Sequence, residues 1–169
     1  AALANADRRC HRLCLTSDVL RRLEPELRKI TPPQVSVEKT DRNSISSFLP
    51  PEAVHQGIAL QCDPLPDPAL EDVLARHREG DSILVVLDQI TDPHNVGAIL
   101  RSAAGFGAHA VIMPDRNAPP ASGTLAKSAS GALELLPLIR VTNLARCLEQ
   151  LADHDYWRIG LDASAPQTL

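Results

Sequence analysis

The 169-residue sequence lacks any apolar run long enough to cross a membrane, although 44% of its residues are hydrophobic. A chain of this size and composition can bury one large core or two small ones, so we expect a soluble globular protein. Cysteine is scarce, and no paired framework or signal peptide is recognisable; the four cysteines are Cys10, Cys14, Cys62 and Cys147. Disulfides are therefore not expected, and we predict a reducing cytoplasm as the compartment.

The sequence also lacks the short motifs of several enzyme classes. The turn after the apolar run 82–90 offers only Gly97, inside the next helix, so neither a dinucleotide fingerprint nor a P-loop is present. Cys10, His11 and Cys14 are adjacent but have no second ligand pair at zinc spacing. H-E-x-x-H and G-x-S-x-G are absent as well. We therefore predict no metal site and no serine hydrolase, and a small-ligand Rossmann-type protein is disfavoured.

Positive charge is scarce overall but unevenly placed. The net charge is −4, which argues against nucleic-acid binding by the whole surface. Residues 1–42 carry nine Lys and Arg against six Asp and Glu, a net of +3, whereas residues 43–169 carry eight against fifteen, a net of −7. Only the N-terminal part can offer a basic face. An ordinary solvated surface with chance clustering explains the same numbers.

The first third of the chain predicts a small α/β domain over residues 1–63. A short apolar strand (13–15) precedes an amphipathic helix capped by Ser17 or Asp18, with Val19, Leu20, Leu23 and Leu27 on one side. A strand (33–39), a short capped helix (41–49) and a further strand (55–62) follow. The stretch "DPLPDP" then places three prolines in six residues, so we put the domain boundary there.

Residues 64–81 predict a linker and connecting helix, and residues 82–169 predict a second α/β domain. Its first strand, 82–90, is continuously apolar, as in a strand buried on both faces of a parallel sheet. Helices and strands then alternate: a helix from Asn95, then segments 108–114, 122–134, 136–141, 143–154 and 156–164. This order predicts a doubly wound sheet, with loop 88–95 and tail 162–164 at one ligand-binding edge.

The segment "DPHNVGAILRSAAGFG" (92–107) contains an arginine that two hypotheses explain. Asn95 fits an N-cap, and the helical period places Val96, Ile99, Leu100, Ala103 and Phe106 on the core face. Gly97, Arg101 and Gly105 then share the outward face. Each of these two glycines costs about 1 kcal/mol of helix stability relative to alanine, which suggests that a partner helix or a substrate backbone needs close access to this face. Arg101 is either an ordinary solvated arginine or a group that a ligand approaches closely.

The same segment resembles the first motif of the SpoU (TrmH) group of SPOUT-class RNA ribose methyltransferases. The matching positions of Asn-x-Gly-x-x-x-Arg-Ser-Ala are Asn95, Gly97, Arg101, Ser102 and Ala103. "AKSASGALELLPLIRVTNLA" (126–145) resembles the segment that follows, and "VHQGIAL" (54–60) looks like the end of the group's N-terminal RNA-binding domain. The resemblance covers most of the chain and is greatest to bacterial 23S rRNA guanosine-2′-O-methyltransferases.

The resemblance implies a ribosomal-protein-like N-terminal domain joined to a partial SPOUT (α/β knot) domain in a homodimer. It implies methyl transfer from S-adenosylmethionine to a ribose 2′-hydroxyl in structured RNA, with Arg101 and Asn95 catalytic and Ala163 and Ser164 at the cofactor. We expect RNA contact to be led by the N-terminal arginines Arg8, Arg9, Arg12, Arg21, Arg22 and Arg28.

Two departures from the family pattern leave alternatives open. The glycine-rich second motif and the late third motif, which form the knot around the cofactor, do not occur before Leu169, and the family's early "G-x-H-A-V" segment is missing too. We therefore expect a chain trimmed at both ends. The main alternative is a non-catalytic RNA-binding protein. Whether Arg101 acts as a base or as an electrostatic stabiliser stays undecided at this point.

Overall fold

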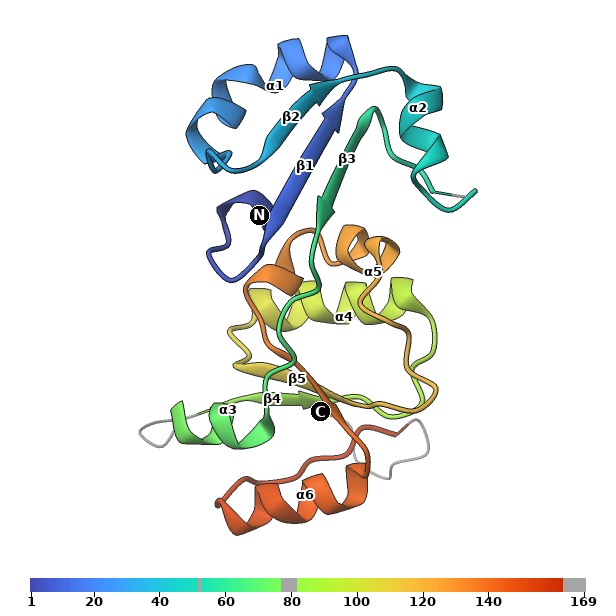
Figure 1. Cartoon of the computed structure of the whole chain (residues 1–169). Coiled ribbons are helices and arrows are strands. Elements are labelled where there is room, and N and C mark those ends of the chain that lie inside the picture. The colour runs from blue at the N-terminus through green and yellow to red at the C-terminus, as the bar shows by residue number, and fades with distance from the viewer. Residues whose placement is uncertain (52, 77–81, 163–169) are drawn as a thin grey trace.

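The computed structural model describes residues 1–51, 53–76 and 82–162, and it contains two three-stranded sheets, one above the other in Figure 1. The first sheet has the strand order β2-β1-β3 and the second β4-β5-β6. The second is entirely parallel, which confirms the predicted α/β class. No helix within the described ranges is both long and apolar enough to span a membrane.

The N-terminal sheet has the predicted β-α-β-α-β order. Its elements, after the short 3₁₀ helix η1 (Ala2–Ala4), are β1 (Cys10–Leu15), α1 (Ser17–Ile30), β2 (Ser36–Lys39), α2 (Arg42–Ser47) and β3 (Ile58–Cys62). Strand β1 lies in the centre, parallel to β2 and antiparallel to β3. The apolar side of α1 packs on this sheet as expected, with Val19 and Leu27 buried. The predicted cap is wrong, because the N-cap residue is Thr16.

The second sheet is covered on both faces. Its elements are α3 (Leu70–Arg76), β4 (Leu84–Val86), α4 (Pro93–Gly105), β5 (Ala110–Pro114), α5 (Gly123–Ser128), the 3₁₀ helix η2 (Ala132–Glu134), β6 (Leu138–Val141) and α6 (Leu144–Asp153). One apolar cluster joins α4, α5 and η2 to the sheet, and another joins α3 and α6 to it. Because both crossovers between consecutive strands lie on the α4 face, the strand order follows the chain order.

Two predicted elements of the second half differ from the structure. The helix expected over 122–134 is divided into α5 and η2, because Ser130 and Gly131 take left-handed φ values of 51° and 94°. The strand expected over 156–164 is absent from residues 156–162, and 163–164 lie outside the described residues. Instead, the chain after α6 returns to β4, where the Tyr156 hydroxyl lies 2.6 Å from Ser82 Oγ.

Candidate functional site

Helix α4 carries the residues that the first motif singles out, and it starts earlier than predicted. Asp92 is the N-cap: its Oδ1 accepts a hydrogen bond of 2.9 Å from the backbone N–H of His94. Pro93 occupies the first helical position, where proline is favoured because the N–H that it lacks would have no partner within the helix. The expectation that Asn95 caps the helix is therefore wrong. Asn95 lies in the first turn with its side chain exposed.

Arg101 lies on the outward face of α4, as the helical period predicts. Val96, Leu100 and Ala103 are buried on the opposite face, against the sheet. Phe106 departs from the prediction: it is the C-cap residue and is 86% exposed. Within the described part of the chain, the exposed Arg101 guanidinium has no hydrogen bond or ion pair. The structure thus leaves this guanidinium available to a ligand.

Gly97 does not serve the approach of a ligand from solvent. It is buried against α5, and a Cβ built on it would lie 2.4 Å from Ser128 Cβ and 2.9 Å from the Ala129 backbone nitrogen. Gly105, in contrast, has nothing within 4 Å of such a Cβ. The glycine of the motif therefore allows α4 and α5 to pack closely, and the prediction of an outward-facing Gly97 is wrong.

Asn95 and Arg101 do not share one side of α4. Six residues separate them, which corresponds to a rotation of about 120° around the helix and a rise of about 9 Å. His94 is seven residues from Arg101 and so lies on its side of the helix, two turns away. The His94 ring contacts α5, with Nδ1 at 2.9 Å from Ser128 Oγ. Sequence reasoning missed this pair, although the spacing of His94 from Arg101 could have indicated it.

The carboxyl ends of β4, β5 and β6 lie along one edge of the parallel sheet, as expected. Asp88 and Asp115 follow the first two of these strands and are exposed. Their negative charge suits a cationic ligand such as a sulfonium. The predicted cofactor residues Ala163 and Ser164 lie outside the described residues. No group of three or more His, Cys, Asp or Glu within the described ranges could hold a metal ion.

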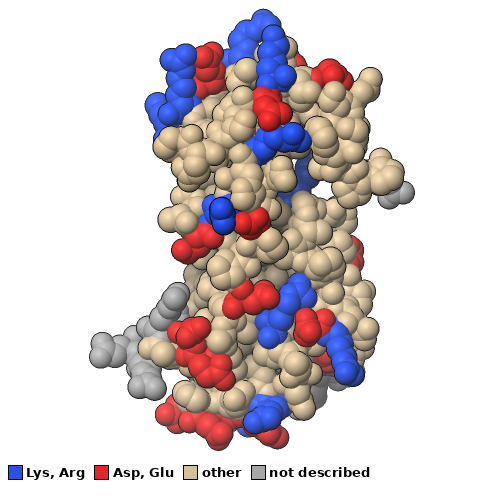
Figure 2. All heavy atoms as spheres, in the orientation of Figure 1, with Lys and Arg blue, Asp and Glu red and all other residues tan. Residues whose placement is uncertain are grey.

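The N-terminal arginines fall into two groups. Arg21, Arg22 and Arg28 are exposed on α1, and Figure 2 shows basic side chains at that end of the molecule with acidic ones among them. Arg9 is exposed too, with a side-chain accessibility of 81%. Arg28 and Arg9 also have carboxylate neighbours, Glu24 at 2.7 Å and Asp63 at 4.0 Å. The remaining two, Arg12 and Arg8, are less exposed.

Arg12 is partly covered: its guanidinium lies 4.5 Å from the Phe48 ring centroid and 3.6 Å from a carboxylate oxygen of Glu38. Arg8 differs most from the sequence-based expectation. Its side chain is only 8% exposed and forms an ion pair of 2.6 Å with Glu134. This guanidinium is therefore already paired with a carboxylate and largely shielded from solvent.

Comparison with known proteins assigns the family. A sequence model described as the SpoU rRNA Methylase family matches residues 82–169. The chain belongs to the SpoU rRNA methylase family. It is also 40% identical over 139 residues to 23S rRNA (guanosine-2′-O-)-methyltransferase RlmB of Pseudomonas aeruginosa, a match that covers 80% of this chain and 55% of that protein. With RlmB of Nitrosomonas europaea the identity is 47% over 116 residues, 68% of this chain and 44% of the relative.

Solved structures show that the fold is that of SpoU methyltransferases. The crystal structure of the SpoU methyltransferase AviRb from Streptomyces viridochromogenes, in complex with AdoMet, superposes with a TM-score of 0.70 at 19% sequence identity. The match covers 91% of this chain and 56% of AviRb. This SpoU family chain thus spans roughly half of the length of the proteins that it matches.

Proposed function

We propose that this chain forms the larger part of an S-adenosylmethionine-dependent RNA ribose 2′-O-methyltransferase, with 23S rRNA guanosine as the substrate. The family membership, the names of the RlmB relatives and the AdoMet complex of AviRb support this proposal. The structural observation that carries it is Arg101, an exposed guanidinium without a partner among the described residues, held on a helix that is itself firmly packed.

We infer that Arg101 stabilises the negative charge that develops on the ribose 2′-oxygen. A ribose hydroxyl is a poor nucleophile, and its oxygen becomes more negative as the proton leaves. A guanidinium does not lose its own proton at physiological pH, so it is a poor base but a permanent positive charge with directed donors. We infer that the hydroxyl proton passes to a phosphate oxygen or to water. Asn95, on another side of α4, can donate a hydrogen bond to the RNA but would not reach the same atom as Arg101.

S-adenosylmethionine, when bound, supplies an electrophilic methyl group on a sulfonium. We propose that it lies at the carboxyl edge of β4 and β5, where the Asp88 and Asp115 carboxylates favour a cation. The segment 162–164, with Ala163 and Ser164, is proposed to complete that edge. The chain's own task is to bring the 2′-oxygen to this edge and to hold Arg101 beside it.

A tritiated-methyl transfer assay on a 23S rRNA fragment tests the proposal, with the wild type and all variants made in a longer protein that carries this chain together with the family's second and third motifs. Arg101→Ala is expected to lower kcat on the order of a hundredfold, the usual scale for one group that stabilises developing charge. Arg101→Lys should restore little of the activity, because a single ammonium does not reproduce the planar fork. Arg146, exposed on α6 across the sheet, provides the matched control, and Arg146→Ala should retain full activity.

All three variants should melt near the wild-type temperature, because exposed side chains contribute about 0.5 kcal/mol or less to stability. Wild-type protein that binds the fragment without methylating it would instead support a non-catalytic RNA-binding protein. An Arg101→Ala variant with wild-type activity would remove Arg101 from the reaction.

We further propose residues 1–63 as the RNA-binding domain, led by Arg9, Arg21, Arg22 and Arg28, with 64–81 as the connection. A homodimer in the cytoplasm is part of the proposal. The free thiols of all four cysteines support a reducing compartment. The large exposed apolar side chains of Trp157, Ile159 and Leu161 support association with a partner surface. Sedimentation as a monomer at micromolar concentration would contradict the dimer.

A further inference from the structure

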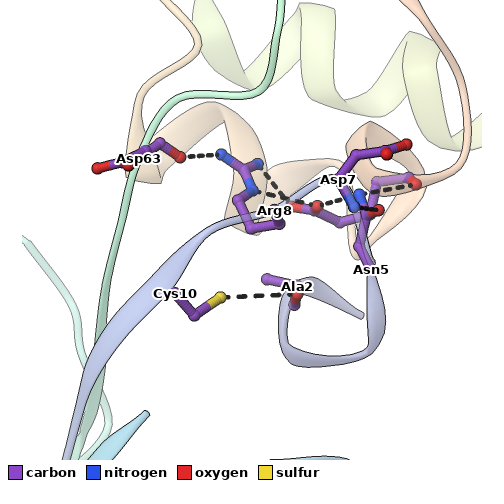
Figure 3. Close-up of polar contacts among 7 residues, drawn as sticks. Ala2, Asn5, Asp7, Arg8, Cys10 and Asp63 are labelled. Atoms are coloured by element: carbon purple, nitrogen blue, oxygen red, sulfur yellow. Dashed lines mark hydrogen bonds and ion pairs between the residues drawn. The ribbon is translucent and has the colours of Figure 1, made fainter. Parts of the chain in front are cut away.

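The first eight residues are anchored to the opposite half of the molecule. Arg8 leads this contact: its guanidinium donates to both carboxylate oxygens of Glu134 in η2, at 2.6 and 3.2 Å, and to the Asp63 carbonyl at 2.9 Å (Figure 3). The Arg8 and Glu134 side chains are only 8% and 6% exposed. A two-point bond between a guanidinium and a carboxylate fixes direction as well as distance.

Neighbouring groups complete the same junction. Asn5 Nδ2 donates to Glu134 Oε2 at 2.9 Å, so the carboxylate is held from two sides. Gly131 lies against the start of the chain, and a Cβ there would come within 2.9 Å of Ala1 Cβ. The N-terminal segment is therefore fitted to the turn between α5 and η2 by shape as well as by charge.

The segment 123–134, which receives Arg8 at Glu134, also supports the helix that carries Arg101. Leu125, Ala129, Ala132 and Leu133 of segment 123–134 pack in one cluster with α4. A second, exposed bond ties the same segment to the N-terminal half, where Lys127 Nζ donates to the Val54 carbonyl at 2.7 Å. One short segment thus contacts the N-terminal half on one side and the Arg101 helix on the other.

We propose that Arg8 and Glu134 are positioning residues, which hold the N-terminal sheet in one orientation relative to Arg101 so that both halves engage one RNA as a rigid unit. This inference rests on the proposed function. Desolvation makes a buried ion pair an inefficient source of stability compared with apolar packing. Its two-point geometry, however, permits only one arrangement of the halves. The covalent connection between them, 63–68, is an extended proline-rich stretch without secondary structure that touches the second half through Leu65, so the direction of the N-terminal sheet depends on the polar contacts as well.

The orientation is measured first, without any assay of activity. Spin labels on unnatural amino acids at position 26 of α1 and position 149 of α6, both exposed, report the distance between the halves. The distance distribution should be narrow in the wild type and clearly broader in Glu134→Gln, which keeps the shape of the side chain and removes its charge. The matched control is Glu24→Gln, which breaks the exposed Arg28–Glu24 pair, 2.7 Å long against 2.6 Å for Arg8–Glu134, and should leave the distribution narrow.

Substrate kinetics of the same variants form the second readout. With Glu134→Gln, the KM for a long rRNA fragment should rise by about tenfold or more, because linked sites that no longer match the RNA geometry lose effective concentration. The kcat at saturating RNA and the KM for S-adenosylmethionine should stay within about twofold, since the residues at Arg101 are unchanged. Asn5→Ala, a milder change to the same carboxylate, should shift both readouts in the same direction if Glu134→Gln fails to fold.

The outcomes separate the two proposals. A lower melting temperature with an unchanged distance distribution and unchanged KM would show that the ion pair is only stabilising and would overturn the inference. Wild-type protein without methyl transfer would defeat the proposed function, whereas the label distances would still decide whether Arg8 and Glu134 fix the orientation.

Discussion

The close contact between α4 and α5 makes Gly97→Ala the sharpest structural perturbation. An alanine Cβ at this position would lie 2.4 Å from Ser128 Cβ, 2.9 Å from the Ala129 nitrogen and 3.0 Å from the Leu125 carbonyl oxygen. Favourable carbon–carbon contacts lie at about 3.5–4.0 Å. Two of the three obstructing atoms belong to the backbone, so α5 cannot relieve the clash by a side-chain rotation.

Two opposing effects set the magnitude. Alanine stabilises a helix interior by about 1 kcal/mol relative to glycine. Overpacking of a well-filled core costs about 1–3 kcal/mol, and the upper part of this range applies where backbone must move. We therefore expect Gly97→Ala to lower the free energy of unfolding by about 1–2 kcal/mol in spite of its better helix propensity.

Thermal and urea denaturation of matched variants provide the measurement. Gly105→Ala is the control, since it adds the same methyl group to the same helix where nothing lies within 4 Å. It should be neutral or slightly stabilising. Each kcal/mol corresponds to about 2–4 °C in Tm for a chain of this size, so the two variants should separate by several degrees. If Gly97→Ala melts at or above the temperature of Gly105→Ala, the close packing of α4 on α5 is refuted.

Three further predictions concern the caps and the charges. Asp92→Ala should cost about 1 kcal/mol in thermal melts and Asn95→Ala much less; the reverse order would identify Asn95 as the cap. Burial alone would raise the pKa of the Glu134 carboxyl. The hydrogen bonds from Arg8 and Asn5 and the positive charge of Arg8 have a larger, opposite effect, so this pKa lies below its ordinary value. The stability that the Glu134 charge contributes should therefore be complete above about pH 4.3 and decline as the pH falls toward the lowered pKa. The free energies of unfolding of wild type and Glu134→Gln should accordingly converge in acid denaturation, and a constant difference would contradict this. Arg21→Ala should reduce the salt dependence of RNA binding by a log-log slope of about 0.7 if that side chain neutralises one phosphate, and an unchanged slope would exclude it.

Periodicity and turn chemistry predicted most elements of the fold, because those signals are local. The α1 face with Val19 and Leu27 and the apolar strands of the second sheet lie where the pattern places them. The segment 156–162 shows the limit of this reasoning. Its alternation of apolar residues is typical of a strand, but a strand also needs backbone partners, and the sequence does not reveal whether a neighbouring chain segment supplies them.

The candidate site shows a similar division. The outward position of Arg101 follows from the helical period alone, and the structure agrees. A partner helix was one of two explanations that the sequence left open for Gly97, but the identity of that helix could not be predicted, because α5 approaches from a distant part of the sequence. The burial of Arg8 could not be predicted, because a count of charges does not distinguish an arginine in solvent from one that pairs with Glu134.

The return of the chain to β4 has a consequence for solubility. Within the described residues β4 pairs only with β5, so its other side is an open sheet edge. Such an edge invites strands of neighbouring molecules to add to it, which is a route to aggregation. The bond between Tyr156 and Ser82 holds the chain after α6 at the start of this edge. Tyr156 thus occupies the start of this edge, and we expect the protein to aggregate more readily at high concentration when the bond between Tyr156 and Ser82 is lost.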